Sequence, residues 1–409
     1  MFRALRHPNF RLFFAGQAVS LIGTWMQMVG QNWLVYDLTK SSFWLGVIGF
    51  LGSLPILLFS LFGGAVADRV PKRPLIIGFQ SVLLTLAFVL GLLTAMGWIA
   101  LWHVAVLAFL IGLVGAFEIP ARQSFLIEMV GKEDLGNAIA LNAAMFNSAR
   151  LIGPALAGPL IDWAGTASCF FFNSASFLAV LLGLLLMKVP PSQRPARTGS
   201  VFESTLDGLR YMRQNPPVLA LVAMVGMVTI FGWSYTVLMP IFADQILHRG
   251  ARGYATLMSM SGVGAVTAAL TLAAITDRVR PRRLAFTGLG IFCVAVTAMA
   301  LSKWYWLSAA CMVFVGFGHV MFFATSNTTL QRRVPDEMRG RVMGIYAFVF
   351  MGFFPLGSLQ AGLVAHWVDA RFAVIFGAAV CAVAAVVVSR LVPPVAPPGQ
   401  TVTPPVTAA

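Results

Sequence analysis

Twelve apolar stretches, each about long enough to cross a membrane, constrain the fold of this chain more than any other feature. They lie near residues 11–34, 43–66, 75–96, 101–127, 136–162, 168–188, 218–240, 254–275, 284–302, 305–326, 341–366 and 371–391. A helix needs about 20 mainly apolar residues to cross the hydrocarbon core of a bilayer. The alternating strands of about ten residues that a membrane barrel requires are not seen in the sequence. We therefore expect an all-α integral membrane protein with twelve transmembrane helices.

The charge content excludes a soluble protein. Asp, Glu, Lys and Arg make up 10% of the 409 residues, against about 25% in soluble domains. The net charge is +14, but the cations gather in short clusters between apolar stretches, so nucleic acid is not an expected partner. The four cysteines lie inside apolar stretches without CxxC or Cys/His spacing, so we expect neither a metal nor a cofactor.

The cations also predict the orientation in the lipid bilayer. If the amino end and alternate loops share one side, that side holds 22 of the 28 Lys and Arg residues, and the other side holds five. Cytoplasmic loops of membrane proteins carry the excess of Lys and Arg. Both termini are therefore expected in the cytoplasm.

The polar stretch 189–217 divides the spans into six at 1–188 and six at 218–392. Its SVFESTLDGLRYMRQ portion is expected to form an amphipathic helix at the membrane surface. The Pro- and Thr-rich tail at 393–409 is expected to be disordered.

The two halves are sequence repeats. An offset of 204 residues places Gly153 on Gly357 and Gly158 on Gly362. Two parallel repeats of six helices are typical of secondary carriers that bind their substrate between the halves.

A charged cluster lies between the second and third spans and recurs, at an offset of 209 residues, in the second half. Its first copy comprises Gly64, Asp68, Arg69, Lys72 and Arg73, and its second copy contains Asp277 and Arg278. This pattern resembles the loop between the second and third helices of the major facilitator superfamily.

These residues have physical roles that would hold the cytoplasmic side shut, as a latch. Gly64 permits close approach of helices. Asp68 can face the positive N-terminal end of the eleventh span, near Arg341. Lys72 or Arg73 can pair with Glu128 at the end of the fourth span. The alternative is that the cations only fix the topology.

The fifth span contains ARLIGPALAG, in which Gly153 and Pro154 are followed by Ala157 and Gly158. This stretch resembles the fifth-span signature of antiporters of the same superfamily. Its small residues predict a smooth helix face that packs against the other half, although such packing faces are common in membrane helices generally.

Longer stretches narrow the resemblance. PNFRLFFAGQAVSLIGTWMQMVGQNWLVYDLTKS, EIPARQSFLIEMVGKEDLGNAIALNAAMFNSARLIGPALAG and VPDEMRGRVMGIYAFVFMGFFPLGSLQAG are similar to the bacterial drug/proton antiporter family that includes enterobactin and macrolide exporters. The chain differs from many drug antiporters in lacking an Arg at the middle of span four. The resemblance implies a multi-pass transporter of the bacterial inner membrane, which works as a monomer.

Polar residues in the first span follow one helical face. Gln17, Ser20, Thr24, Gln27 and Gln31 are spaced by three and four residues in turn. Such a stripe either lines a water-filled cavity or forms hydrogen bonds with another helix. Aromatic residues that could line an apolar pocket include Trp25, Trp33, Phe117, Phe146, Trp233, Tyr235 and Phe322.

Ionisable residues inside the spans are candidates for proton coupling. Glu118 and Arg150 fall at similar depths in adjacent spans, so they are expected to pair, with Arg122 as a competing partner. His319 lies in the middle of the tenth span, where it is either a titrating group or a packing residue.

The expected function is secondary transport. No G-x-x-x-x-G-K-[ST] loop for ATP occurs, so an ion gradient is the expected energy source. We expect export of a small amphipathic molecule by alternating access, coupled to proton influx. The alternatives are an importer or lysolipid translocator of the same fold, or a membrane enzyme or sensor, for which no catalytic motif is found.

Overall fold

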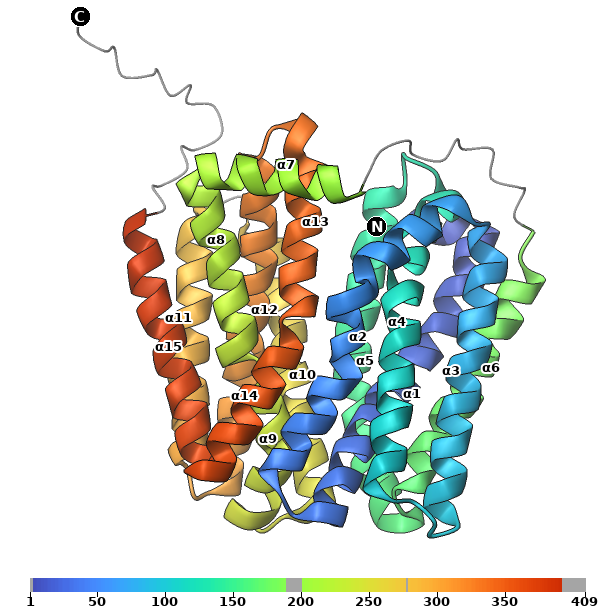
Figure 1. Cartoon of the computed structure of the whole chain (residues 1–409), viewed down its shortest axis with the longest axis vertical. Helices are drawn as coiled ribbons and strands as arrows, with labels where there is room; N and C mark the ends of the chain where they lie inside the picture. The colour runs from blue at the N-terminus through green and yellow to red at the C-terminus, as the bar shows by residue number, and fades with distance from the viewer. Residues whose placement is uncertain (1–2, 189–200, 277–278, 392–409) are drawn as a thin grey trace, which may run out of the picture.

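The computed structural model describes residues 3–188, 201–276 and 279–391, without the side chains of residues 68, 201–204 and 391. Figure 1 shows helices that run up and down through two neighbouring bundles. The N-terminal half holds η1 (Arg3–Arg6), α1 (Pro8–Thr39), α2 (Ser42–Arg69), α3 (Lys72–Ala95), α4 (Leu101–Val130), α5 (Leu135–Ala164) and α6 (Ala167–Leu186).

The helix α7 (Val201–Gln214) joins this half to the C-terminal half. The C-terminal half holds α8 (Pro216–Met227), η2 (Val228–Gly232), α9 (Tyr235–Ile241), η3 (Phe242–Ile246), α10 (Gly250–Ile275), α11 (Pro281–Leu301), α12 (Tyr305–Arg333), α13 (Asp336–Gly352), α14 (Phe354–Trp367) and α15 (Ala370–Leu391).

Among the described residues, eleven helical segments are long and apolar enough to cross a membrane. Helix α5 is not one of them, because its 30 residues include three Asn, an Arg and an Asp. It is nevertheless long enough to span, and it packs between α1 and α10. With α5, the number of spanning segments agrees with the predicted twelve.

Exposed tryptophans mark one end of the bundle. They lie in or beside the connections opposite the chain termini, and they are Trp98, Trp102, Trp163, Trp304, Trp306 and Trp367. Trp is enriched at membrane–water interfaces, where its ring meets both lipid and water. We call this end of the molecule the far end, and the end that carries α7 and both termini the terminal end (Figure 1).

Two of the predicted spans are interrupted. The seventh runs from Pro216 to Ile246 but contains the π-helical segments η2 and η3. The eleventh breaks between α13 and α14, directly before Pro355. Proline lacks an N–H, and its ring clashes with the carbonyl of the fourth residue before it, so a straight helix cannot pass through this point.

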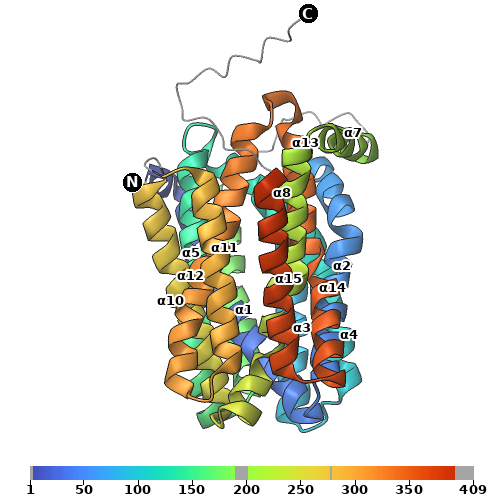
Figure 2. The same ribbon diagram turned by 90° about the vertical axis from the view of Figure 1, so that its left-hand side faces the viewer.

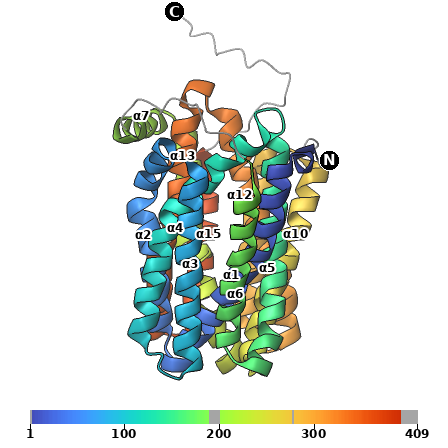
Figure 3. The same cartoon turned by 90° about the vertical axis from the view of Figure 1, so that its right-hand side faces the viewer.

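The outer and inner helices are arranged alike in the two halves. Figure 3 shows α3 and α6 on the outside of the N-terminal half, and Figure 2 shows α11 and α15 on the outside of the C-terminal half. The halves meet mainly through two helix pairs, α5 with α10 and α2 with α14.

Repeat-related glycines make both of these contacts. A Cβ on Gly158 of α5 would lie 2.9 Å from the Cβ of Ala255 on α10, and one on Gly362 of α14 would lie 2.7 Å from the Cα of Gly46 on α2. Gly158 and Gly362 are 204 residues apart, and Gly46 and Ala255 are 209 apart. The sequence repeat is therefore a structural repeat of the interface.

Hydrogen bonds close the interface toward the far end. Tyr36 donates to Asp244 at 2.6 Å, and Asn32 donates to the hydroxyl of Tyr254 at 3.2 Å. In the part of the chain that the structure describes, the side-chain hydrogen bonds between the halves lie from the middle of the helices to this end. The ribbons of α2 and α13 diverge toward the terminal end (Figure 1).

Helix α7 occupies the stretch predicted to be amphipathic and lies across the terminal end (Figure 1). Met212 is buried, whereas Arg210 and Arg213 are exposed. Asp207 of α7 pairs with Arg341 of α13 at 3.2 Å. The helix is thus attached to the start of the eleventh span.

Candidate functional site

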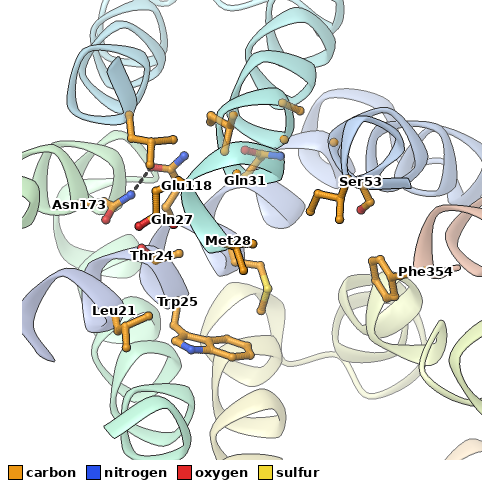
Figure 4. A pocket seen from close by; sticks show the side chains of 18 of the residues that line it. Leu21, Thr24, Trp25, Gln27, Met28, Gln31, Ser53, Glu118, Asn173 and Phe354 are labelled. Carbon is orange, nitrogen blue, oxygen red and sulfur yellow. Dashed lines mark hydrogen bonds between the residues drawn. The ribbon is translucent and has the colours of Figure 1, made fainter. Parts of the chain in front are cut away.

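A cavity of about 500 Å³ lies between the two halves near the middle of the helices. Its lining comes from α1 to α6 on one side and from the seventh span, α10, α13 and α14 on the other. Figure 4 shows Asn173, Gln27 and Glu118 on one side of this space and Phe354 on the other. Volumes of this order accommodate small organic molecules.

All five residues of the polar stripe on α1 line the cavity: Gln17, Ser20, Thr24, Gln27 and Gln31. The stripe also forms hydrogen bonds inside its own half. Asn173 of α6 donates to the side-chain oxygen of Gln27 at 2.6 Å, and Thr24 donates to the carbonyl of Ser20. The stripe therefore does both things that the sequence allowed: it lines a cavity, and it forms a hydrogen bond with another helix.

Glu118 of α4 is buried in the cavity wall and has two donors. Gln80 of α3 and Arg122, one turn further along α4, each donate to its Oε1 at 3.0 Å. The expected pair of Glu118 with Arg150 is wrong, and the competing partner Arg122 takes its place. Similar depth in the membrane did not suffice, because the rotation of α5 about its axis directs Arg150 to another helix.

Arg150 points to the C-terminal half. Its Nη2 donates to the hydroxyl of Ser261 on α10 at 2.8 Å, and its guanidinium lies 6.0 Å from the centre of the Trp25 ring. The residue is 5% exposed and lines the cavity. The guanidinium therefore lies where the two halves meet.

His319 of α12 is buried among aromatic rings. The ring centres of Phe323 and Trp233 lie 4.6 and 5.2 Å from its own. Neither ring nitrogen has a hydrogen-bond partner among the described residues. Its role in proton coupling stays a prediction.

The C-terminal wall of the cavity is mainly apolar. Trp233, directly after η2, stacks on Phe350 at 5.4 Å and contacts Phe354 at 5.3 Å. The other lining residues of this half are Thr236, Val237, Met258 and Met351. Of the aromatic candidates, Trp25, Phe146 and Trp233 line the cavity.

Two cations of the predicted latch bind within the N-terminal half. Lys72 lies 2.7 Å from Glu128, the carboxylate expected at the end of the fourth span. Arg73 instead donates to the carbonyls of Leu184 and Leu185 at the end of α6. These contacts join α3 to α4 and α6 and do not cross to the other half.

The remaining latch residues either lie outside the described part of the chain or make no close contact. Asp68 lies in the last turn of α2, but its side chain is outside the described part, and Asp277 and Arg278 lie outside it altogether. The expectation of a close approach at Gly64 is wrong in this conformation, since a Cβ there would meet no atom within 4 Å. The close contact occurs at Gly63, where a Cβ would lie 2.2 Å from the carbonyl oxygen of Ala116.

The small-residue motif of α5 contacts both neighbours. Gly153 packs on α1, where a Cβ would lie 2.5 Å from that of Trp25, and Gly158 packs on α10. Pro154 and Ala157 are buried in the same face. Ser259 of α10 donates to the carbonyl of Leu151 at 2.9 Å. The motif lies at the contact between the halves.

Sequence reasoning missed several site residues. Gln80 and Asn173 support Glu118 and the polar stripe, and Asp244 binds Tyr36 across the interface. Each is a polar residue within an otherwise apolar helix, which is a signal that the sequence carried.

The transmembrane secretion effector family matches residues 1–400 of the chain. The staphyloferrin A transporter of Staphylococcus aureus (strain NCTC 8325 / PS 47) is 26% identical over 358 residues, which covers 87% of this chain and 89% of that protein. The multidrug efflux pump Tap of Mycolicibacterium fortuitum is 28% identical and covers 88% and 90%. The enterobactin exporter EntS of Escherichia coli O1:K1 / APEC is 25% identical and covers 83% and 81%.

Solved structures share the fold. A bacterial homologue of the human lysosomal transporter Spinster, inward-facing and unoccupied, superposes with a TM-score of 0.72 at 15% identity over 92% of this chain and 97% of its own. The nucleoside transporter NupG gives 0.70 at 14% identity over 96% and 99%. This chain is a multi-pass membrane transporter rather than an enzyme, and it belongs to the transmembrane secretion effector family of the major facilitator superfamily.

Proposed function

We propose that this protein exports a small amphipathic molecule by alternating access, driven by proton influx. The observation that carries the proposal is the cavity between the halves, which is closed by side-chain contacts at the far end. The excess of cations on the terminal side supports an orientation in which that side faces the cytoplasm of a bacterial inner membrane. The cavity then receives its substrate from the cytoplasm, and a monomer suffices for the cycle.

The relatives support this direction. Those that match most of the chain are named as an exporter of enterobactin, an efflux pump for drugs and a transporter of staphyloferrin A. The substrate of this chain is therefore proposed to be drug-like or siderophore-like. The two walls of the cavity, one with polar and charged groups among apolar ones and the other mainly apolar, suit such an amphipathic molecule.

Glu118 is the proposed proton carrier. Its carboxylate is buried in the cavity wall and accepts from Gln80 and Arg122. Protonation would remove the negative charge that holds Arg122, so proton binding and the arrangement of this wall are linked. When the halves rock, Glu118 would take a proton from one side and release it to the other.

Vectorial transport in sealed vesicles tests the proposal. Purified protein should move a fluorescent amphipathic dye when a pH gradient is imposed, since each pH unit supplies about 1.4 kcal/mol per proton. We expect Glu118→Gln to abolish the dependence on the gradient and to retain exchange of dye across the membrane. Asp162→Asn, which removes an exposed carboxylate of the same half, is the matched control.

Two outcomes would contradict this assignment. Wild-type movement that ignores the gradient would refute proton coupling altogether. Full gradient dependence in Glu118→Gln would move the coupling role elsewhere, and His319 would be the next residue to test.

We also propose that Asp68 helps to close the cytoplasmic side against the start of α13. Asp68→Asn should slow transport several-fold, because a carboxylate at a helix N-terminus contributes up to about 2 kcal/mol. The amount of protein in the membrane should not change. Asp37→Asn, in which an exposed acid at the far end is altered, should leave the rate unaffected. A wild-type rate for Asp68→Asn would exclude the latch.

A further inference from the structure

Arg150 is a buried cation without a carboxylate partner in the described part of the chain. Its Nη2 donates to the neutral hydroxyl of Ser261, and its Nε–H has no acceptor among the described residues. Placing a guanidinium inside a membrane protein is costly unless its charge and its donors are satisfied. Since Arg150 lines the cavity, a molecule in the cavity can supply what is missing.

The charges of the cavity leave this requirement unmet. Its charged lining residues are Glu118, Arg122 and Arg150. Glu118 is engaged by Arg122, one turn further along α4, and by Gln80 of α3, and it forms no ion pair with Arg150 among the described residues. The lining therefore carries one more guanidinium than carboxylate.

The surroundings of Arg150 offer further donors. Tyr235 lies beside the guanidinium and interacts with it electrostatically and through a long hydrogen-bond contact, although its hydroxyl makes no hydrogen bond of ordinary geometry with a described residue. His319 also interacts electrostatically with Arg150, and neither of its ring nitrogens has a hydrogen-bond partner among the described residues. A neutral imidazole always presents one N–H. The Nε–H of Arg150 itself lacks an acceptor, and an oxyanion provides the strongest one.

We propose that Arg150 is the anchor for an anionic group of the transported molecule, a carboxylate or another oxyanion, whose apolar body packs on Trp233 and Phe354. The inference rests on the proposed transport function and adds the charge of the substrate to it. Trp25, which packs on the guanidinium at 6.0 Å, holds the anchor at the cavity wall.

A matched pair of probes isolates the charge. Dansylglycine carries a carboxylate, and dansylglycinamide replaces it with a neutral amide of similar size. Fluorescence of the dansyl group reports binding to the purified full-length protein. We expect the wild type to bind the acid about tenfold tighter than the amide, because a hydrogen bond to a charged group is stronger than one to a neutral group.

Substitutions then assign the preference to one residue. Arg150→Gln should lose affinity for the acid alone, so it should bind both probes equally. Arg150→Lys should keep part of the preference for the acid. Arg213→Gln removes the same charge from an exposed site on α7 and should behave as the wild type. Ser261→Ala removes the link between α5 and α10 but keeps the guanidinium, so the preference for the acid should remain.

The proposal is overturned if the wild type binds both probes equally, if it binds neither, or if Arg150→Gln keeps the preference. If Arg150 had only a structural role, Arg150→Gln would weaken the binding of both probes to the same extent. Ser261→Ala would then weaken the binding of both probes as well. The transport assay is independent of this result. If the protein prefers the acid but moves no dye across the vesicle membrane, the proposed transport function is refuted and the anion site stands. If it moves dye but binds both probes equally, the transport function stands and the anion site is refuted.

Discussion

The two walls of the cavity are built on the same scaffold but differ in chemistry, because the charged and amide side chains of the lining all belong to the N-terminal half. Gly112 of α4 and Gly316 of α12 are 204 residues apart, and a Cβ on either would lie 1.9 Å from a carbonyl oxygen of the helix opposite, that of Gly52 or Ser261. Six residues beyond Gly112 stands Glu118, with its ion pair. Six residues beyond Gly316 stands Phe322, which is fully buried behind the cavity lining and packs on Phe323.

This difference separates the residues that the helices need for packing from the residues that the cavity needs for binding. The glycine contacts fix how helices approach one another, so both repeats need them and both keep them. The lining determines what the cavity binds, and a molecule with a polar and an apolar side needs two unlike walls. The N-terminal half supplies the amides and charges beside apolar side chains such as Trp25 and Phe146, and the C-terminal half supplies a mainly apolar surface.

The largest effect is expected at the shared scaffold. Gly362→Ala should nearly abolish transport, because the new Cβ would lie 2.7 Å from the Cα of Gly46 and 2.8 Å from the carbonyl oxygen of Ser42, which are backbone atoms. Gly158→Ala should be milder, because its Cβ meets the methyl of Ala255 at 2.9 Å. Transport rates in vesicles, normalised to protein content, measure both.

The control for this series is Gly290→Ala, where a Cβ would meet nothing within 4 Å. If Gly362→Ala transported as fast as this control, the glycine contact would not hold the halves together, and the scaffold would not be the shared element.

A smaller effect is expected at the aromatic wall. Trp233→Ala should weaken binding of the dansyl probes about thirtyfold, or about 2 kcal/mol, since a Trp ring offers ~150–250 Å² of surface and only part of it faces the cavity. Both probes should lose affinity equally, because the ring contacts their common apolar part. Trp306→Ala, at an exposed position at the far end, is the control. Selective loss of the acid would show that the walls do not divide the work in this way.

The smallest effect on binding is expected in the polar stripe, where a substitution acts mainly on the stability of the protein. Gln27→Leu leaves the amide of Asn173 without its acceptor, which should lower stability by about 1–3 kcal/mol. Thermal unfolding in detergent measures this loss. The double variant with Asn173→Leu should recover part of it, because no unpaired amide then remains. An additive loss in the double variant would show that this hydrogen bond contributes nothing.

Several parts of the site were predictable because they depend on local pattern. The spacing of Gln17, Ser20, Thr24, Gln27 and Gln31 fixes one helix face, and all five line the cavity. The pairing of Lys72 with Glu128 followed from charges at the ends of consecutive helices. Neither inference required the rotation of one helix relative to another.

The sequence by itself determined the membrane-spanning class, the two repeats, the polar face of α1 and the glycine faces, because helix period and apolar length are properties of each segment alone. The tertiary structure decided which partner each charged group has. Glu118 pairs with Arg122 and Gln80, and Arg150 with Ser261, although depth in the membrane allowed Glu118 and Arg150 to meet. Depth follows from position along a helix, whereas the partner depends on how each helix is rotated, and packing of all helices together sets that rotation.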